Sequence, residues 1–119
     1  MNFSIVCPTY NSSKFIHKTV DCLLNQTYHN FEVIFSDDGS TDNTLEILEK
    51  FRKKFVQKNI NTKILKNKHN GPGFARNEAL KYSSNQWISF IDSDDLWTDE
   101  KLEKVNNCLL YTSPSPRDT

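Results

Sequence analysis

Three carboxylates directly follow an apolar run in W-I-S-F-I-D-S-D-D-L-W, the segment at residues 87–97. Asp92, Asp94 and Asp95 fall within four positions, and carboxylates this close repel one another unless a cation or hydrogen-bond donors compensate their charge. Hard divalent cations prefer such oxygen ligands. A small set of acids that leaves coordination positions open suits Mg²⁺ or Mn²⁺ shared with a substrate phosphate. The segment therefore indicates a site for a divalent metal and a phosphate.

A structural alternative explains the same acids as a turn that caps the next helix. Thr98 or Asp99 is already available as that cap, however, and no loop separates the apolar run from Asp92. A calcium EF-hand loop is excluded because the required Gly is missing and the third acid falls at the wrong step.

A second acidic group, Asp37-Asp38, comes shortly after the apolar segment F-E-V-I-F and precedes Gly39 and Ser40. A turn from a strand into a helix explains Gly39, which supplies a positive φ, and Ser40, which can cap the helix. Such a turn does not require two acids at the end of the strand. An aspartate at this point can accept hydrogen bonds from a nucleobase or a ribose.

A third candidate is the glycine-rich segment G-P-G-F-A-R-N at residues 71–77. Its G-x-G resembles the start of a dinucleotide fingerprint, but Arg76 stands where the third Gly would be, so that interpretation fails. A glycine-rich turn that opens a helix still offers backbone N–H groups to an anion. Arg76 can add a charged fork for a phosphate, or it can form a surface salt bridge.

Short apolar segments alternate four times with segments of helical spacing. Strands are predicted at Phe3–Cys7, which Pro8 ends, and at Phe31–Phe35, Thr62–Leu65 and Trp87–Ile91. Helices are predicted after a cap at Asn11 or Ser12, over residues 45–55, from about Phe74 to Tyr82, and after Thr98 or Asp99, where the apolar positions are Leu102, Val105 and Leu109. This alternation predicts an α/β fold with a largely parallel sheet and flanking helices.

Polar groups follow three of the predicted strands. They are Thr9-Tyr10-Asn11, Asp37-Asp38 and the acids at residues 92–95. Ligands of open parallel sheets bind beyond the carboxyl ends of the strands, and these ends share one edge. We therefore expect the three polar groups to meet in one site.

Composition limits the class of protein. The 119 residues include 15 basic and 15 acidic ones, and a formal net charge of zero argues against a nucleic-acid-binding protein. No membrane segment or signal pattern is present, which favours a cytoplasmic location, including the cytoplasmic face of the membrane.

Cys7, Cys22 and Cys108 have no C-x-x-C spacing and lie in apolar contexts, so we expect reduced thiols in the core.

The remaining reactive side chains carry no recognisable pattern. His17, His29 and His69 share no ligand spacing and are expected at the surface, and no serine stands in a nucleophile motif.

Residues 1–110 form the predicted domain. Residues 111–119, Y-T-S-P-S-P-R-D-T, contain two prolines and no apolar period. This segment is expected to be a disordered tail, either a flexible linker or foreign sequence joined where the true chain was truncated.

Four ordered blocks together resemble the family 2 glycosyltransferases, which have the GT-A fold, a Rossmann-like α/β sandwich. The blocks are S-I-V-C-P-T-Y-N, L-L-N-Q-T-Y-H-N-F-E-V-I-F-S-D-D-G-S-T-D-N-T, G-P-G-F-A-R-N-E-A-L and W-I-S-F-I-D-S-D-D-L-W. Each block alone is moderately specific, whereas all four in this order are highly specific. The resemblance covers Phe3 to about Leu109, and it implies transfer of a sugar from a nucleoside diphosphate donor, most commonly a UDP-sugar.

The resemblance assigns roles at the nucleoside end of the donor. Pro8, Thr9 and Tyr10 look like the loop that borders the nucleoside, with Tyr10 near the base. Asp37 looks like the acid that hydrogen-bonds the base.

It also assigns roles at the diphosphate end. Arg76 matches the A-R-N segment near the nucleotide. Asp92-Ser93-Asp94 looks like the D-x-D motif, in which Asp92 contacts the ribose side and Asp94 binds Mn²⁺ or Mg²⁺. Asp95 has no assigned role. A divalent cation would make two phosphates tolerable among these acids and stabilise the leaving diphosphate.

One departure from the family concerns catalysis. Family members take the general base for the acceptor hydroxyl, which leads to inversion at the sugar carbon, from a second half of the domain. That half also binds the acceptor, a glycan, a lipid-linked glycan or a protein. We expect both beyond residue 119, so the chain corresponds to the donor-binding half. General base catalysis contributes roughly 10²–10⁴-fold, so this half alone is expected to be a poor transferase.

Two other functions fit parts of the pattern. A non-catalytic module that binds a nucleotide and a metal would use the same acids, and only an acceptor half with a suitably placed Asp separates it from an enzyme. A phospho-receiver domain also uses acids at strand ends. It requires a phospho-accepting Asp after the third strand, where this chain has Lys66-Asn67-Lys68, so it is disfavoured.

Overall fold

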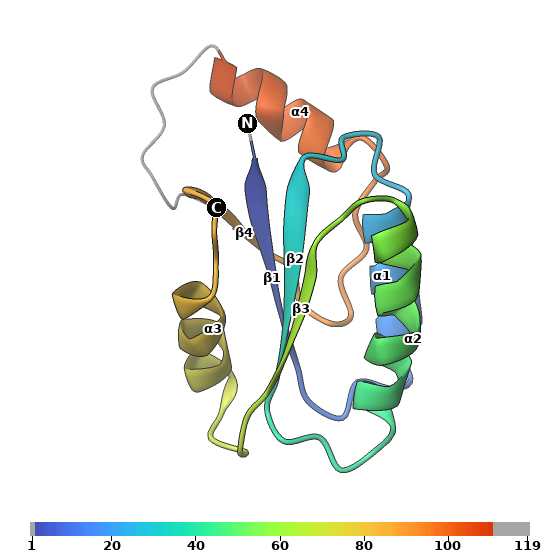
Figure 1. The fold of residues 1–119 in the computed structure, drawn as a ribbon, viewed down its shortest axis with the longest axis vertical. Helices are drawn as coiled ribbons and strands as arrows, with labels where there is room; N and C mark the ends of the chain where they lie inside the picture. The colour runs from blue at the N-terminus through green and yellow to red at the C-terminus, as the bar shows by residue number, and fades with distance from the viewer. Residues whose placement is uncertain (1, 111–119) are drawn as a thin grey trace.

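The computed structural model describes residues 2–110, which form a four-stranded sheet with helices on both faces (Figure 1). The strands are β1 Phe3–Thr9, β2 Phe31–Asp37, β3 Thr62–Lys66 and β4 Trp87–Phe90. The helices are α1 Ile16–Leu24, α2 Thr44–Gln57, α3 Pro72–Lys81 and α4 Lys101–Leu110. The predicted alternation is confirmed, and the tail predicted at residues 111–119 lies outside the described residues.

The sheet has the strand order β3-β2-β1-β4, and each of its neighbouring pairs is parallel. In the register, Phe3 lies between Phe31 of β2 and Trp87 of β4, and at the other end Thr9 pairs with Asp37. The carboxyl ends of β1, β2 and β3 are therefore level, because Asp37 also pairs with Lys66. This arrangement is the parallel sheet that the sequence predicts.

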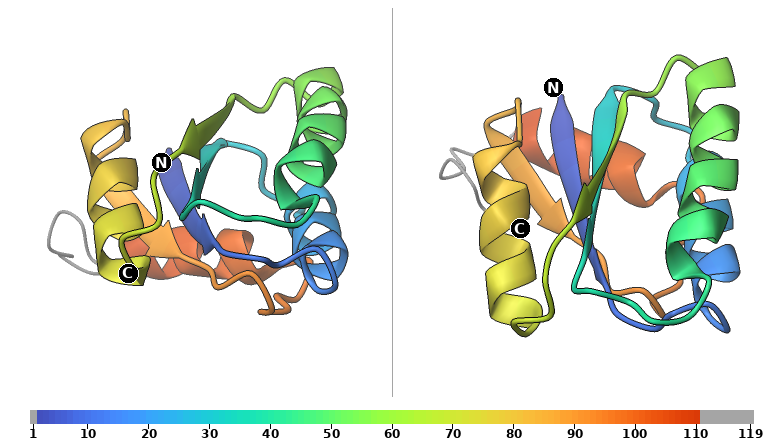
Figure 2. Two further views of the ribbon diagram at one scale, coloured as in Figure 1. Left: turned by 90° about the horizontal axis from the view of Figure 1, so that it is seen from below. Right: turned by 60° about the horizontal axis from the view of Figure 1, so that its bottom comes forward.

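The two faces of the sheet bury different side chains, since successive residues of a strand point to opposite faces. Phe3, Ile5 and Cys7 of β1 belong to the larger apolar cluster, which α1, α2 and α4 cover. Val6 of β1 belongs to a smaller cluster with Ala79 of α3. Figure 2 shows α3 on one side of the sheet and α1 with α2 on the other. The described chain is thus a three-layer α/β sandwich.

All four strands differ from their predicted bounds at the carboxyl edge. β3 ends one residue later than predicted, at Lys66, and β4 ends one residue earlier, at Phe90. β2 continues beyond Phe35 to Asp37, and β1 continues through Pro8 to Thr9, so the prediction that Pro8 ends the strand is wrong. A proline fits here because its missing N–H faces the β4 side of β1. The last hydrogen bond on that side runs from the Ile91 N–H to the Val6 oxygen, so the proline lies where the β1–β4 ladder ends and the pairing with β2 is kept.

The predicted helix starts also need correction. Neither Asn11 nor Ser12 is the N-cap of α1, which is Phe15. Ser12 instead contributes its backbone oxygen, which accepts hydrogen bonds from the N–H groups of Phe15 and Ile16. Helix α3 starts at Pro72 rather than Phe74, because a proline at the first helical position loses no hydrogen bond and has a suitable φ. Helix α4 starts at Lys101, just after the predicted caps.

The cysteine prediction holds for only one residue. Cys7 is fully buried, but Cys22 is partly exposed and Cys108 is exposed. Cys22 of α1 and Cys108 of α4 each precede a leucine in the sequence, but neither lies on the buried face of its helix. The core-thiol interpretation of Cys22 and Cys108 was therefore wrong.

A buried carboxylate at the amino edge of the sheet links three strands. Glu32 of β2 accepts hydrogen bonds from the Ser4 hydroxyl and the Ser84 N–H, both at 2.6 Å, and its Oε1 lies 3.1 Å from Nζ of Lys63. Burial raises the pKa of Glu32, but the hydrogen bonds and the Lys63 ammonium outweigh it, so the pKa lies below its ordinary value of 4.5. The charged form therefore stabilises the fold.

We predict that Glu32→Gln lowers the free energy of unfolding at pH 7 by roughly 1.5–3 kcal/mol, the range for hydrogen bonds to charged groups. The folded-state pKa of Glu32 is depressed. Its contribution is therefore complete above the unfolded-state value and is lost as pH falls through the folded-state value. Urea denaturation from pH 7 down to pH 3 measures the difference between the two proteins.

The control is Glu49→Gln, which removes an exposed ion pair with Arg52 and should change stability by well under about 1 kcal/mol. Equal losses in both variants, or a Glu32→Gln effect that grows as pH falls, would contradict the assignment.

Candidate functional site

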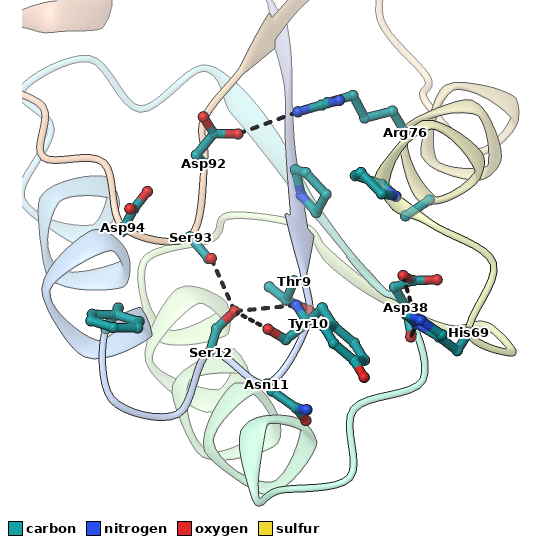
Figure 3. Close-up of a pocket in the computed structure, with 14 residues that line it drawn as sticks. Thr9, Tyr10, Asn11, Ser12, Asp38, His69, Arg76, Asp92, Ser93 and Asp94 are labelled. Atoms are coloured by element: carbon teal, nitrogen blue, oxygen red, sulfur yellow. Dashed lines mark hydrogen bonds and ion pairs between the residues drawn. The ribbon is translucent and has the colours of Figure 1, made fainter.

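A pocket of about 410 Å³ lies at the carboxyl edge of the sheet, where the loops after the strands meet (Figure 3). Its lining comes from the β1–α1 loop, the end of β2, the β3–α3 loop with the first turns of α3, and the loop after β4. The residues that line it are Pro8, Thr9, Tyr10, Asn11, Ser12, Phe15, Asp38, His69, Pro72, Ala75, Arg76, Asp92, Ser93 and Asp94. The predicted convergence of three polar groups is confirmed.

Asn11 fastens the β1–α1 loop to the turn after β2. Its φ of +46° is in the left-handed region, which asparagine tolerates better than most residues. The Asn11 side-chain oxygen accepts the N–H of Thr41 at 2.8 Å, and its own N–H donates to the Ser40 hydroxyl at 2.8 Å. The turn thereby fixes the direction in which the preceding residue, Tyr10, leaves β1.

Two hydroxyl groups hold the acidic loop after β4 in place. The buried Ser12 hydroxyl donates to the Ser93 hydroxyl at 2.9 Å. The buried Thr19 hydroxyl of α1 lies 3.0 Å from the backbone oxygen of Ser93 and 2.8 Å from that of Asp95. These bonds hold the loop through the Ser93 hydroxyl and two backbone oxygens, and none of them uses a carboxylate. Sequence reasoning missed Thr19, which looks like any polar residue within a helix.

The three acids of this loop form a compact ligand set. One carboxylate oxygen each from Asp92, Asp94 and Asp95 can be chosen so that the three atoms lie within 4.8 Å of one another. One Asp95 oxygen accepts the backbone N–H of Asp92 at 2.9 Å, so it also closes the turn. Among the described residues, the Asp94 carboxylate has no hydrogen-bond or ion-pair partner. Hard, closely spaced oxygen donors with an unengaged carboxylate fit a divalent cation such as Mg²⁺ or Mn²⁺.

Arg76 faces the acids across the pocket. Its guanidinium Nη2 lies 3.5 Å from Oδ1 of Asp92, and both side chains are exposed, so the pair is a weak one. Arg76 lies in the second turn of α3, which points it toward the loop after β4 (Figure 3). A basic group beside an acidic ligand set is an arrangement that suits an anion held jointly with a cation.

Cys7 lies beneath the acidic loop and takes no part in its chemistry. Burial raises the pKa of the Cys7 thiol well above its ordinary range, and the carboxylates of Asp92 and Asp95 raise it further. A thiol that stays protonated is neither a nucleophile nor a metal ligand.

Asp37 is occupied within the protein. It is fully buried and does not line the pocket. Its Oδ1 accepts the Thr9 hydroxyl at 2.8 Å and the Ser40 hydroxyl at 2.6 Å, and its Oδ2 accepts the Ser40 N–H at 2.8 Å. These bonds tie the end of β1 to the turn after β2. Of the predicted site residues Pro8, Thr9, Tyr10, Asp37, Arg76, Asp92, Ser93 and Asp94, Asp37 alone lies outside the lining.

The neighbouring Asp38 takes the place at the pocket that the sequence analysis gave to Asp37. Its carboxylate, only 3% exposed as a residue, accepts the N–H of Asn70 at 2.7 Å and the N–H of Gly71 at 3.1 Å. These bonds dock the β3–α3 loop against the end of β2. The difference of one residue has a simple cause. Asp37 is the last residue of β2 and its carboxylate is enclosed by Thr9 and Ser40, whereas Asp38 has left the strand.

His69 also belongs to the site, although sequence reasoning treated it only as a surface residue. Its side chain is 60% exposed, yet Nδ1 lies 3.0 Å from Oδ2 of Asp38. The imidazole stacks on the Tyr10 ring, with 4.4 Å between ring centroids and 26° between planes. In the sequence, the one hint that His69 belongs to the site is that it stands shortly before the G-P-G-F-A-R-N segment. That hint does not reveal Asp38 or Tyr10 as its partners.

Gly39 allows the β3–α3 loop to pack against the end of β2. Its φ is +75°, and a Cβ there would lie 2.7 Å from the backbone nitrogen of His69. A side chain at residue 39 would therefore be strained and would also push the β3–α3 loop away.

We predict that Gly39→Ala lowers the free energy of unfolding by at least about 1–3 kcal/mol and opens the β3–α3 loop. Urea denaturation measures the first effect. Faster amide exchange of Asn70 and Gly71, whose N–H groups donate to Asp38, reports the second.

The matched control is Gly73→Ala. A Cβ at Gly73 meets no atom within 4 Å, and the residue lies in α3, where alanine is favourable by up to about 1 kcal/mol. Gly73→Ala should therefore be neutral or stabilising. A neutral Gly39→Ala would show that the loop does not depend on this contact.

A family model and the relatives of this chain point to the same family. The family model for glycosyl transferase family 2 matches residues 4–108. The poly(ribitol-phosphate) beta-N-acetylglucosaminyltransferase TarS of Staphylococcus aureus is 42% identical over 105 residues, which cover 87% of this chain and 18% of TarS. The Escherichia coli beta-1,3-glucosyltransferase WfgD, whose name specifies UDP-Glc, is 43% identical and covers 94% of this chain and 42% of WfgD. The chain spans less than half the length of these relatives.

Solved structures agree. The crystal structure of S. aureus TarS 1–349 in complex with UDP has a TM-score of 0.81 at 40% identity, over 90% of this chain and 31% of that one. TarS 1–349 has also been solved with UDP-GlcNAc, and it matches with the same TM-score. The mannosyltransferase PcManGT of Pyrobaculum calidifontis, solved with GDP-Man and Mn²⁺, has a TM-score of 0.81 at 21% identity, which shows a common fold alone. The chain therefore belongs to glycosyl transferase family 2 and has the GT-A fold.

Proposed function

We propose that this chain is the donor-binding part of a glycosyltransferase that transfers a sugar from a UDP-sugar to an acceptor hydroxyl. The observation that carries the proposal is the composition of one pocket. An exposed aromatic ring, Tyr10, and a buried acid, Asp38, lie at one end of it, and Arg76 with the acidic loop lies at the other (Figure 3). A nucleoside diphosphate has the complementary order, a flat base followed by two phosphates.

The nucleoside end suits a base with a ring N–H. Tyr10 is 46% exposed and offers a ring face for stacking, and Pro8 and Thr9 provide the adjacent backbone. Asp38 can only accept hydrogen bonds when ionised, so it favours a base that donates one, as uracil does at N3. The similarity to TarS, which has been solved with UDP, supports uridine. We assign the base contact to Asp38 because Asp37 is enclosed by Thr9 and Ser40.

The diphosphate end suits a metal-bound anion. Asp94 would hold the divalent cation, Mn²⁺ or Mg²⁺, and Asp92 with Ser93 would face the ribose side. A bound cation would neutralise charge on the leaving diphosphate. The Arg76 guanidinium, 41% exposed, is within reach of the same pocket and would exchange its weak pairing with Asp92 for a phosphate oxygen.

The rest of the reaction lies outside the described pocket. We propose that the sugar is transferred with inversion, and that the general base and the acceptor site come from a part of the protein beyond residue 119. The acceptor would be a glycan, a lipid-linked glycan or a protein, and the reaction would take place in the cytoplasm or at the cytoplasmic face of the membrane. Among the described residues, none of the helices has both the length and the apolarity to cross a bilayer.

We predict that Asp94→Asn abolishes the Mn²⁺-dependent part of UDP binding. Loss of even an outer-shell partner weakens metal binding by roughly 10–100-fold, and Asp94 is proposed as a direct ligand. Isothermal titration of UDP with Mn²⁺ and with EDTA measures the effect.

The control is Asp99→Asn, which removes an acid close in sequence but outside the cluster of Asp92, Asp94 and Asp95. It should leave UDP binding nearly intact. Equal losses in both variants would point to a folding defect and refute the metal assignment. UDP binding with no sugar transfer by the protein in its full natural length would favour the non-catalytic module.

A further inference from the structure

We propose that the His69 side chain occupies the nucleobase position of the donor pocket, and that a nucleoside must displace it in order to bind. His69 would then be a specificity-determining residue, because only a base that reproduces its contacts can replace it. The inference rests on the proposed function, since it concerns the nucleoside end of the same pocket.

The imidazole of His69 makes two contacts at once. Its ring stacks on Tyr10 at a centroid distance of 4.4 Å, and Nδ1 lies 3.0 Å from Oδ2 and 3.1 Å from the backbone oxygen of Asp38. Both oxygens are acceptors, so Nδ1 must carry the hydrogen. His69 is therefore a flat ring that stacks on a tyrosine and donates a ring N–H to a carboxylate.

A base with a ring N–H would use the same two partners. Uracil stacked on Tyr10 would direct its N3–H at the Asp38 carboxylate, which is the arrangement that the imidazole already has. The other approaches to that carboxylate are taken, because Asp38 is 3% exposed and also accepts the N–H groups of Asn70 and Gly71. A base and the His69 ring therefore compete for one position rather than sharing it.

The His69 side chain can leave without disturbing the loop that carries it. It is 60% exposed, so water is available to it on leaving the pocket. The loop itself is docked through backbone groups, namely the N–H groups of Asn70 and Gly71 on Asp38 and the close approach of Gly39 to the His69 backbone. None of these contacts involves the imidazole.

The competition favours some bases over others. A base that offers an N–H to Asp38 recovers the hydrogen bond that His69 gives up. Cytosine presents an acceptor at N3, so displacement of His69 would leave the buried carboxylate facing another acceptor, which is costly. We therefore expect UDP to displace His69 and CDP to do so poorly.

The test is titration of UDP, CDP and inorganic pyrophosphate, each with Mn²⁺, into the wild-type protein and His69→Ala. Removal of the competing ring should tighten UDP binding by roughly three- to tenfold, the equivalent of one aromatic stacking contact. Pyrophosphate binding should not change, because pyrophosphate has no base. A control variant, His29→Ala, alters an exposed histidine before β2, at the opposite edge of the sheet, and should bind UDP like the wild type.

A second variant distinguishes the effect of the missing ring from the effect of a folding defect. His69→Phe keeps a ring that can stack on Tyr10 but donates no hydrogen bond to Asp38, so its UDP affinity should lie between those of the wild type and His69→Ala. Weaker or unchanged UDP binding in His69→Ala would overturn the inference, as would an equal gain for pyrophosphate. If wild type and variants bind pyrophosphate but not UDP, the proposed function fails and this inference fails with it.

Discussion

The parallel pairing of β1 with both β2 and β4 is the constraint on which the site depends. Because β1 lies in the centre of the sheet, its register with each neighbour decides where the following loops begin. Thr9 is level with Asp37, and Val6 with Phe90, so all three strands deliver their next residues to one edge. An antiparallel β4 would carry the acidic loop to the opposite edge, about a strand length away from Tyr10.

Two adjacent aspartates at the end of β2 have different structural partners, and this difference organises the pocket. Asp37 joins the ends of β1 and β2 through Thr9 and Ser40, and Asp38 captures the β3–α3 loop through two backbone N–H groups. Neither carboxylate is left without donors, so both can be buried. The cost is that Asp38 has little room for a ligand while His69 is in place.

The acids after β4 are tolerated for a different reason. Asp92 and Asp94 are exposed to water, and the loop that carries them is held by Thr19 and Ser12 through hydrogen bonds that do not use those carboxylates. Their mutual repulsion is therefore screened in the unbound protein. A metal ion bound with a nucleoside diphosphate would find these ligands already positioned, which limits the conformational entropy lost on binding.

Several features follow from the sequence by itself. Alternating apolar segments and helical periodicity predict the parallel α/β sheet, and the polar groups after Cys7, Phe35 and Ile91 predict one shared site. These signals are local, since periodicity and residue type within a short window determine which segments become strands and where they end. The ordered motif blocks add the family, which the comparison confirms.

Only the tertiary structure decided which aspartate faces the pocket, that His69 stacks on Tyr10, and that Asn11 fastens a loop instead of capping a helix. Each of these facts depends on a partner distant in the chain: His69 meets Asp38 across 31 positions, and Asn11 meets Thr41 across 30. A local pattern carries no information about such partners. They are selected when the sheet register brings the loops together, because each buried polar group must then find a donor or an acceptor.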